Sequence, residues 1–78
     1  SGIQNVAVSI NKDLQYFVNN KPVATSDMEN ELKSALSGVE NPTIILRVEE
    51  SVPIENAVLV MDIANQNQYK LILAVRPK

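Results

Sequence analysis

The sequence predicts a two-layer α+β (α/β) domain, in which one mixed sheet carries two helices packed on one face. Two segments, residues 26–39 and 54–64, repeat apolar residues at helical spacing. The segments around them alternate apolar and polar residues or form short apolar runs, as strands do. The predicted order of elements is therefore β-β-(β)-α-β-α-β. Crossovers are right-handed, so both helices fall on one face if both crossovers step the same way across the sheet.

The N-terminal third predicts a β-hairpin followed by a short edge strand. Apolar residues alternate over residues 6–10 and again over residues 14–18, and a polar break of hairpin length separates the two segments. Asn19 and Asn20 suit a tight turn because Asn tolerates positive φ. The short strand that follows contains Pro22, which cannot donate a hydrogen bond to a sheet, so we expect it at an edge.

The first helix is expected to take Ser26 as its N-cap, because Glu29 three residues later completes a capping box. Glu29 and Lys33 are spaced as an ion pair on the polar side of the helix. Gly38 stands where the end of a helix favours a left-handed residue. The stripe expected to face the core consists of Met28, Leu32, Ala35, Leu36 and Val39.

The C-terminal half predicts an interior strand, a second helix and a last strand. Residues 43–48 are almost continuously apolar, which favours the middle of the sheet. Ser51 is a candidate N-cap for the second helix, with Pro53 in its first turn. The buried stripe of this helix is expected to be Ile54, Ala57, Val58, Met61 and Ala64. Leu59 and Ile63 are expected on the opposite ridge, where they form a candidate contact point or are simply exposed apolar residues.

The parity of the strands divides the sheet residues between a face under the helices and an open face. The covered face is expected to hold Val6, Val8, Ile10, Ile44, Leu46, Val48, Leu71, Leu73 and Val75. The open face is expected to hold Ala7, Ser9, Phe17, Thr43, Ile45, Arg47, Ile72, Ala74 and Arg76. An open face with so many apolar residues favours contact with a partner or a second subunit. The alternative is that the long side chains of Lys70, Arg47 and Arg76 cover the apolar atoms.

The composition argues against catalysis, metal binding and nucleic-acid binding. The 78 residues include no His and no Cys, which removes the usual zinc ligands and the usual members of nucleophilic triads. A net charge of -2 and an aromatic content of 4% do not fit a nucleic-acid binder. Glu49, Glu50 and Glu55 are typical partners of a helix dipole rather than an acid–base pair. We therefore expect a single interaction domain over residues 3–78, with no enzymatic activity and no cofactor, after a cloning remnant at residues 1–2.

Several stretches of the sequence resemble the periplasmic domain of the ExbD/TolR family. The stretches are residues 43–54, 58–62 and 69–73 in the second half, and residues 16–23 in the first. The family pattern is a strand that ends in Arg-x-(Asp/Glu), a helix with Val-Met-Asp and a Lys-led last strand. The matching motif residues are Arg47, Glu49, Pro53, Met61, Asp62 and Lys70. The chain departs from the pattern at Ile54, where the family often has Tyr, and at Asn67-Gln68, where it usually has Ala-Gly.

The resemblance implies a subunit of a proton-driven motor in the bacterial inner membrane. Family members carry a single transmembrane helix with a proton-relaying Asp, so the proton-relay residue lies outside this sequence. The periplasmic domain is expected to form a homodimer and to relay energy to a TonB-like protein for outer-membrane transport, in a complex with ExbB-like proteins. In the TolR branch the domain works in the Tol system and engages peptidoglycan. An alternative of another class is a regulatory domain that binds a small ligand.

The expected mode of contact is strand addition at a sheet edge. Because Pro22 protects one edge, the opposite edge is the better acceptor. The contact residues for a partner or a second copy are expected to be Leu71, Ile72, Leu73, Ala74, Val75 and Arg76, together with Leu59 and Ile63. Asp62 is either a lone surface carboxylate or a partner of Arg47 or Lys70.

Overall fold

Five strands form one mixed sheet in the order β3-β2-β1-β4-β5. The computed structural model describes residues 5–75. Along the chain the elements are β1 (Asn5–Ile10), β2 (Tyr16–Val18), β3 (Lys21–Val23), α1 (Thr25–Leu36), β4 (Thr43–Val48), α2 (Ile54–Gln66) and β5 (Lys70–Val75). Strands β1, β2 and β3 are joined by antiparallel pairing, whereas β4 pairs in parallel with both β1 and β5. The predicted fold class and the predicted order of elements are confirmed.

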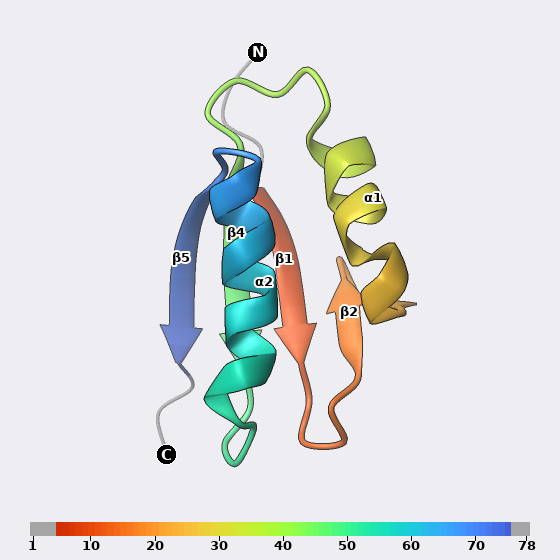
Figure 1. The fold of residues 1–78 in the computed structure, drawn as a ribbon, viewed down its shortest axis with the longest axis vertical. Coiled ribbons are helices and arrows are strands. Elements are labelled where there is room, and N and C mark those ends of the chain that lie inside the picture. The colour runs from red at the N-terminus through yellow and green to blue at the C-terminus, as the bar shows by residue number, and fades with distance from the viewer. Residues whose placement is uncertain (1–4, 76–78) are drawn as a thin grey trace.

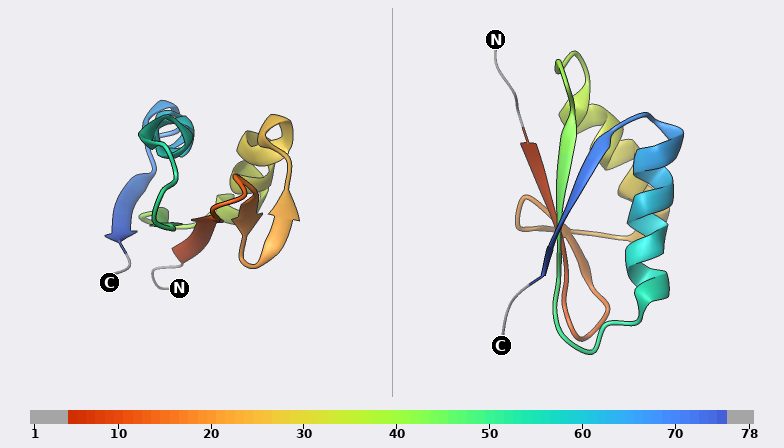
Figure 2. Two further views of the ribbon diagram at one scale, coloured as in Figure 1. Left: turned by 90° about the horizontal axis from the view of Figure 1, so that it is seen from below. Right: turned by 90° about the vertical axis from the view of Figure 1, so that its left-hand side faces the viewer.

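Both helices lie on the same side of the sheet, and the other side carries no helix (Figures 1 and 2). The strand order explains why. The first crossover runs from β3 to β4 and the second from β4 to β5, so both step in the same direction across the sheet. As predicted, Pro22 lies in an edge strand, and β4 lies in the interior between β1 and β5.

The core lies between the sheet and the helices. Strand parity places alternate residues of β1, β2 and β4 on the helix side, where they are at most 5% exposed except for Val48, which is half-buried. They meet three residues from each helix that are equally buried. The buried apolar residues are Val6, Val8, Ile10, Tyr16, Val18, Met28, Leu32, Leu36, Ile44, Leu46, Ala57, Val60 and Ala64. On the edge strand β5 the prediction fails in part, because Leu73 is 43% exposed instead of covered.

Helix α1 begins two residues earlier than predicted. Thr25 is its first residue, Ala24 occupies the N-cap position, and no side chain caps the helix. The predicted N-cap Ser26 is therefore wrong, and the backbone carbonyl of Ala24 accepts a hydrogen bond from the Asp27 N–H at 2.9 Å. Of the predicted stripe, Met28, Leu32 and Leu36 are buried, Ala35 is exposed, and Val39 lies half-buried beyond the helix end. Gly38 has a φ of 74°, as a left-handed residue after the helix should.

Helix α2 is rotated relative to the prediction. Its buried residues are Ala57, Val60 and Ala64, whereas Ile54 is 70% exposed and Val58 is 40% exposed. Leu59 and Ile63, which were expected to face solvent, are half-buried against the core. Pro53 occupies the N-cap position without a side-chain cap, so the predicted cap Ser51 is also wrong.

A pair of hydrogen bonds fixes this rotation of α2. The Asn56 Nδ2 donates to the Tyr16 hydroxyl oxygen at 2.9 Å, and that hydroxyl donates to the Asn56 carbonyl oxygen at 3.2 Å. Tyr16 is 5% exposed on β2, so its hydroxyl needs a partner close by. With Asn56 turned toward β2, the residues on the opposite side of the helix, Ile54 and Val58, face away from the core.

Candidate functional site

The outer edge of β5 is a free sheet edge. Within residues 5–75, β4 is the strand that pairs with β5, and no strand pairs with its other side. The Lys70 N–H donates to the Pro42 carbonyl oxygen at 2.9 Å, which sets the direction of the backbone groups. In a strand, successive residues direct their N–H and C=O groups to opposite edges. The backbone groups of Leu71, Leu73 and Val75 therefore point away from β4.

Strand β5 has exposed apolar residues on both faces. Ile72 is 47% exposed on the open face, and Leu73 is 43% exposed on the helix side. Viewed from the helix side, α2 lies over β4 and leaves β5 beside it (Figure 1). The sequence from Leu71 to Val75 contains no Pro and no charged residue. A free edge with these properties is a template for pairing with another strand.

The opposite edge, β3, has the features that block such pairing. It is three residues long, and Pro22 is its central residue. The Lys21 Nζ lies 2.9 Å from the Glu31 Oε1, so a charged pair also stands at this edge. Short length, proline and lysine are the usual means by which proteins protect an edge strand. The two edges of the sheet therefore differ: β3 is protected and β5 is not.

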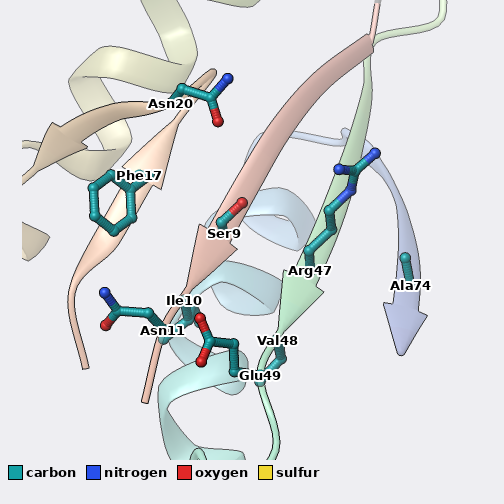
Figure 3. Close-up of a pocket in the computed structure, with 9 residues that line it drawn as sticks. All are labelled: Ser9, Ile10, Asn11, Phe17, Asn20, Arg47, Val48, Glu49 and Ala74. Carbon is teal, nitrogen blue, oxygen red and sulfur yellow. The ribbon is translucent and has the colours of Figure 1, made fainter. Parts of the chain in front are cut away.

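A groove crosses the open face of the sheet (Figure 3). Its volume is about 610 Å³. Its floor is one transverse row of the register, in which Phe17 pairs with Ser9, Ser9 with Arg47, and Arg47 with Ala74. The groove is lined by Ser9, Ile10, Asn11, Phe17, Asn20, Arg47, Val48, Glu49 and Ala74. Its volume lies within the usual range for small-ligand sites, roughly 300–1,000 Å³.

Arg47 is the cation of this groove. Its side chain is exposed on the open face, as strand parity predicted. The ion pairs among residues 5–75 join Lys21 to Glu31 and Lys33 to Glu29, so Arg47 has no carboxylate partner within the described chain. A guanidinium without a carboxylate partner can bind a carboxylate and stack on an apolar surface. The half-buried Phe17 lies across the groove from Arg47, on the other side of Ser9 (Figure 3).

The other residues singled out by the sequence are dispersed. Glu49 lines the groove at the end of β4. Asp62 is exposed on α2 and pairs with neither Arg47 nor Lys70, so it is a lone surface carboxylate. Pro53 is exposed at the start of α2, and Met61 is half-buried against the core. Thr43, expected on the open face, is only 5% exposed. Arg76 lies outside the described residues.

The structure adds functional candidates that the sequence reasoning missed. Asn11 and Asn20 line the groove, although the sequence placed them only in turns. The sequence alone could not place them in one groove, because two different turns bring them to the open face of the sheet. Ile54 and Val58 are exposed at i,i+4 spacing on α2, where the prediction had Leu59 and Ile63. No periodic pattern could have chosen between these two stripes, since both are apolar.

No centre for metal chemistry emerges over residues 5–75. In this range no three His, Cys, Asp or Glu side chains are grouped so as to hold a metal ion. No helix of the described chain is both long enough and apolar enough to cross a membrane. The groups at β5 and in the groove are backbone amides, apolar side chains, side-chain amides, one hydroxyl, one carboxylate and one guanidinium, which can bind a partner through hydrogen bonds and apolar contacts.

Comparison with known proteins identifies a family for almost the whole chain. The family model described as biopolymer transport protein ExbD/TolR matches residues 2–78. No curated protein matches the chain significantly. The match covers every element of the fold, including the two sheet edges and the groove. The chain therefore belongs to the ExbD/TolR family of biopolymer transport proteins.

Proposed function

We propose that this chain is the periplasmic domain of an ExbD-like subunit of a motor driven by the proton motive force. In this proposal the domain forms a homodimer and relays energy to a TonB-like partner for transport across the outer membrane. Two observations support it: the family match over residues 2–78 and the unprotected outer edge of β5. The free edge carries the argument, because it offers a binding surface that needs no reactive side chain.

Strand addition suits a module that transmits motion. An extended segment laid along β5 would bond with the outward backbone groups of Leu71, Leu73 and Val75. It would also cover parts of Ile72 and Leu73, which are nearly half exposed. Two domains held near each other by membrane helices would pair at a raised effective concentration, so weak edge contacts would suffice.

Hydrogen exchange of the backbone amides of individual strands tests this proposal. The amides of β5 are followed with and without a synthetic peptide from the periplasmic part of a TonB-type protein. We expect slower exchange at Leu71, Leu73 and Val75, whose N–H groups point outward, and no change in β3 at the protected edge. Unchanged exchange along residues 70–75, with added peptide and at high protein concentration, would overturn the proposal.

A TolR-like role is a second candidate, and the groove on the open face favours it. The groove offers the half-buried ring of Phe17, two amides, a hydroxyl, the Glu49 carboxylate and the Arg47 guanidinium, which are groups that bind sugars and charged peptides. In this role the domain engages peptidoglycan. A pull-down with purified cell-wall sacculi separates the two candidates: binding that is lost in Arg47→Ala supports the TolR-like role, and no binding excludes it.

A further inference from the structure

A notch lies on the helix side of the sheet, between the end of β4, the start of α2 and Leu73 of the edge strand β5. Its volume is about 180 Å³. It is lined by Val48, Glu49, Glu50, Val52, Pro53, Ile54, Ala57 and Leu73. Six of these are apolar, and the other two are exposed glutamates from the loop after β4. We name this site the edge notch.

The edge notch has apolar walls that the fold leaves open. Ile54 is 70% exposed and Leu73 is 43% exposed, although both line the same site. Val58, one helical turn after Ile54, is 40% exposed on the same side of α2. A strand added to β5 would direct alternate side chains toward this helix side, because side chains alternate along a strand.

We propose that the edge notch selects which strand can pair with β5. It takes one apolar side chain from an added strand, and Glu49 and Glu50 bind a basic side chain two residues away on the same face of that strand. The preferred occupant is therefore an extended peptide that contains an apolar residue, any residue and then Lys or Arg, or the reverse order for the opposite strand direction. This inference rests on the proposed function, since it requires pairing at β5.

The charges of the notch favour such a peptide over a second copy of this chain. Both charged residues that line the notch are acidic, and no basic residue lines it. In an antiparallel pair of β5 strands related by a two-fold axis, the helix side of one strand stays on the helix side of the other. The second copy would then present Leu71 and Leu73 there, while its Lys70 lies on the opposite face. A second copy fills the notch with apolar atoms but leaves both glutamates unpaired.

Four peptides with blocked termini test this sequence preference by their binding to the 78-residue chain. They have equal length and share one Thr-rich sequence apart from the positions that are varied. The first has Leu and Arg two positions apart, the second replaces Leu by Ala, the third replaces Arg by Glu, and the fourth places Leu and Arg side by side. Titration is followed by chemical shifts of the β5 amides. We expect the first peptide to bind about tenfold more tightly than the Ala peptide, which loses the Leu that fills the notch, and up to about fivefold more tightly than the other two, because an ion pair with the exposed glutamates contributes less.

Variants of the chain identify the notch itself. Glu50→Lys should weaken binding of the Leu-x-Arg peptide and strengthen binding of the Leu-x-Glu peptide. Glu40→Lys makes the same charge change at an exposed site elsewhere and should change neither affinity. Ile54→Asn should weaken binding of all peptides that carry Leu. It should not lower the melting temperature of the domain, because Ile54 is already 70% exposed. The circular dichroism of each variant confirms that it is folded.

The possible outcomes distinguish failure of the notch inference from failure of the proposed function. If all four peptides shift the β5 amides equally, pairing at β5 stands and the notch inference is wrong. If the chain dimerises through β5 and Ile54→Asn weakens the dimer while Glu50→Lys does not, a second copy occupies the notch and the inference is also wrong. If no peptide shifts any β5 amide and the chain stays monomeric, the proposed function fails as well.

Discussion

A proline at Leu73 tests the direction of the β5 backbone, on which pairing depends. The Leu73 N–H points away from β4, so Leu73→Pro removes no hydrogen bond within the domain. Ile72 directs its N–H toward β4, so Ile72→Pro breaks the interior ladder. A little over half of the Leu73 side chain is covered in the free domain. Its loss should therefore cost about 1 kcal/mol of the roughly 2 kcal/mol that a fully buried Leu contributes.

The two variants should therefore separate stability from binding. We expect Leu73→Pro to lower the free energy of unfolding by about 1–2 kcal/mol, and Ile72→Pro by about 3 kcal/mol or more. For a TonB-type peptide, Leu73→Pro loses an edge hydrogen bond and gains a steric clash. Together these should weaken binding by about 3 kcal/mol, which is roughly a hundredfold.

Leu73→Ala is the matched control, because it removes the same side chain and keeps the N–H. It should weaken peptide binding only several-fold, since Leu73 gains about 1 kcal/mol when the added strand covers its exposed part. The assays are urea unfolding for stability and isothermal titration calorimetry for affinity. If Leu73→Pro binds the peptide as well as Leu73→Ala does, or if it unfolds the domain as Ile72→Pro does, the assignment of the outer edge is refuted.

Three further variants test the fold and the groove. Tyr16→Phe removes the hydroxyl that is hydrogen-bonded to Asn56 and should lower the free energy of unfolding by about 1–2 kcal/mol. The melting temperature should then fall by roughly 4–16 °C, and a fall below about 2 °C would contradict the role of this contact. Gly38→Ala meets no atom within 4 Å but forces Ala to a φ of 74°, so urea unfolding should show a loss of about 1 kcal/mol, and an unchanged midpoint would contradict it. Arg47→Ala should leave stability within about 0.5 kcal/mol, because Arg47 is exposed and unpaired among residues 5–75. A larger loss of stability in that variant would show that Arg47 holds the fold rather than a ligand.

Local patterns predicted most of the fold. Alternation over residues 6–10 and the apolar run of β4 identified the interior strands, and Pro22 identified one edge. The rotation of α2 could not be predicted, because Ile54 and Leu59 are both apolar and either could face the core. The contact between Tyr16 and Asn56 decides it, and those residues lie 40 positions apart. The helix starts were also misplaced, since backbone carbonyls serve where side-chain caps were expected.

Of the candidate site, the free strand edge was predicted from the sequence, whereas the notch and the groove formed by side chains were not. The edge opposite Pro22 was predicted to be the more open one, and the strand order places the last strand, β5, at that edge. The edge notch was not predicted, because its walls come from β4, β5 and the start of α2, and because Ile54 was assigned to the core. The groove was missed as a cavity for a similar reason, since Asn11 and Asn20 reach it from separate turns.

Site-specific photo-crosslinking in the intact motor complex tests the central claim most directly. A photoreactive residue at Ile72, on the free edge, is compared with one at Lys21 on the protected edge and one at Ala35 on α1. We predict crosslinks to a second copy or to the TonB-like protein from position 72, and none from positions 21 and 35. Crosslinks from position 21 or 35 with none from position 72 would contradict the account.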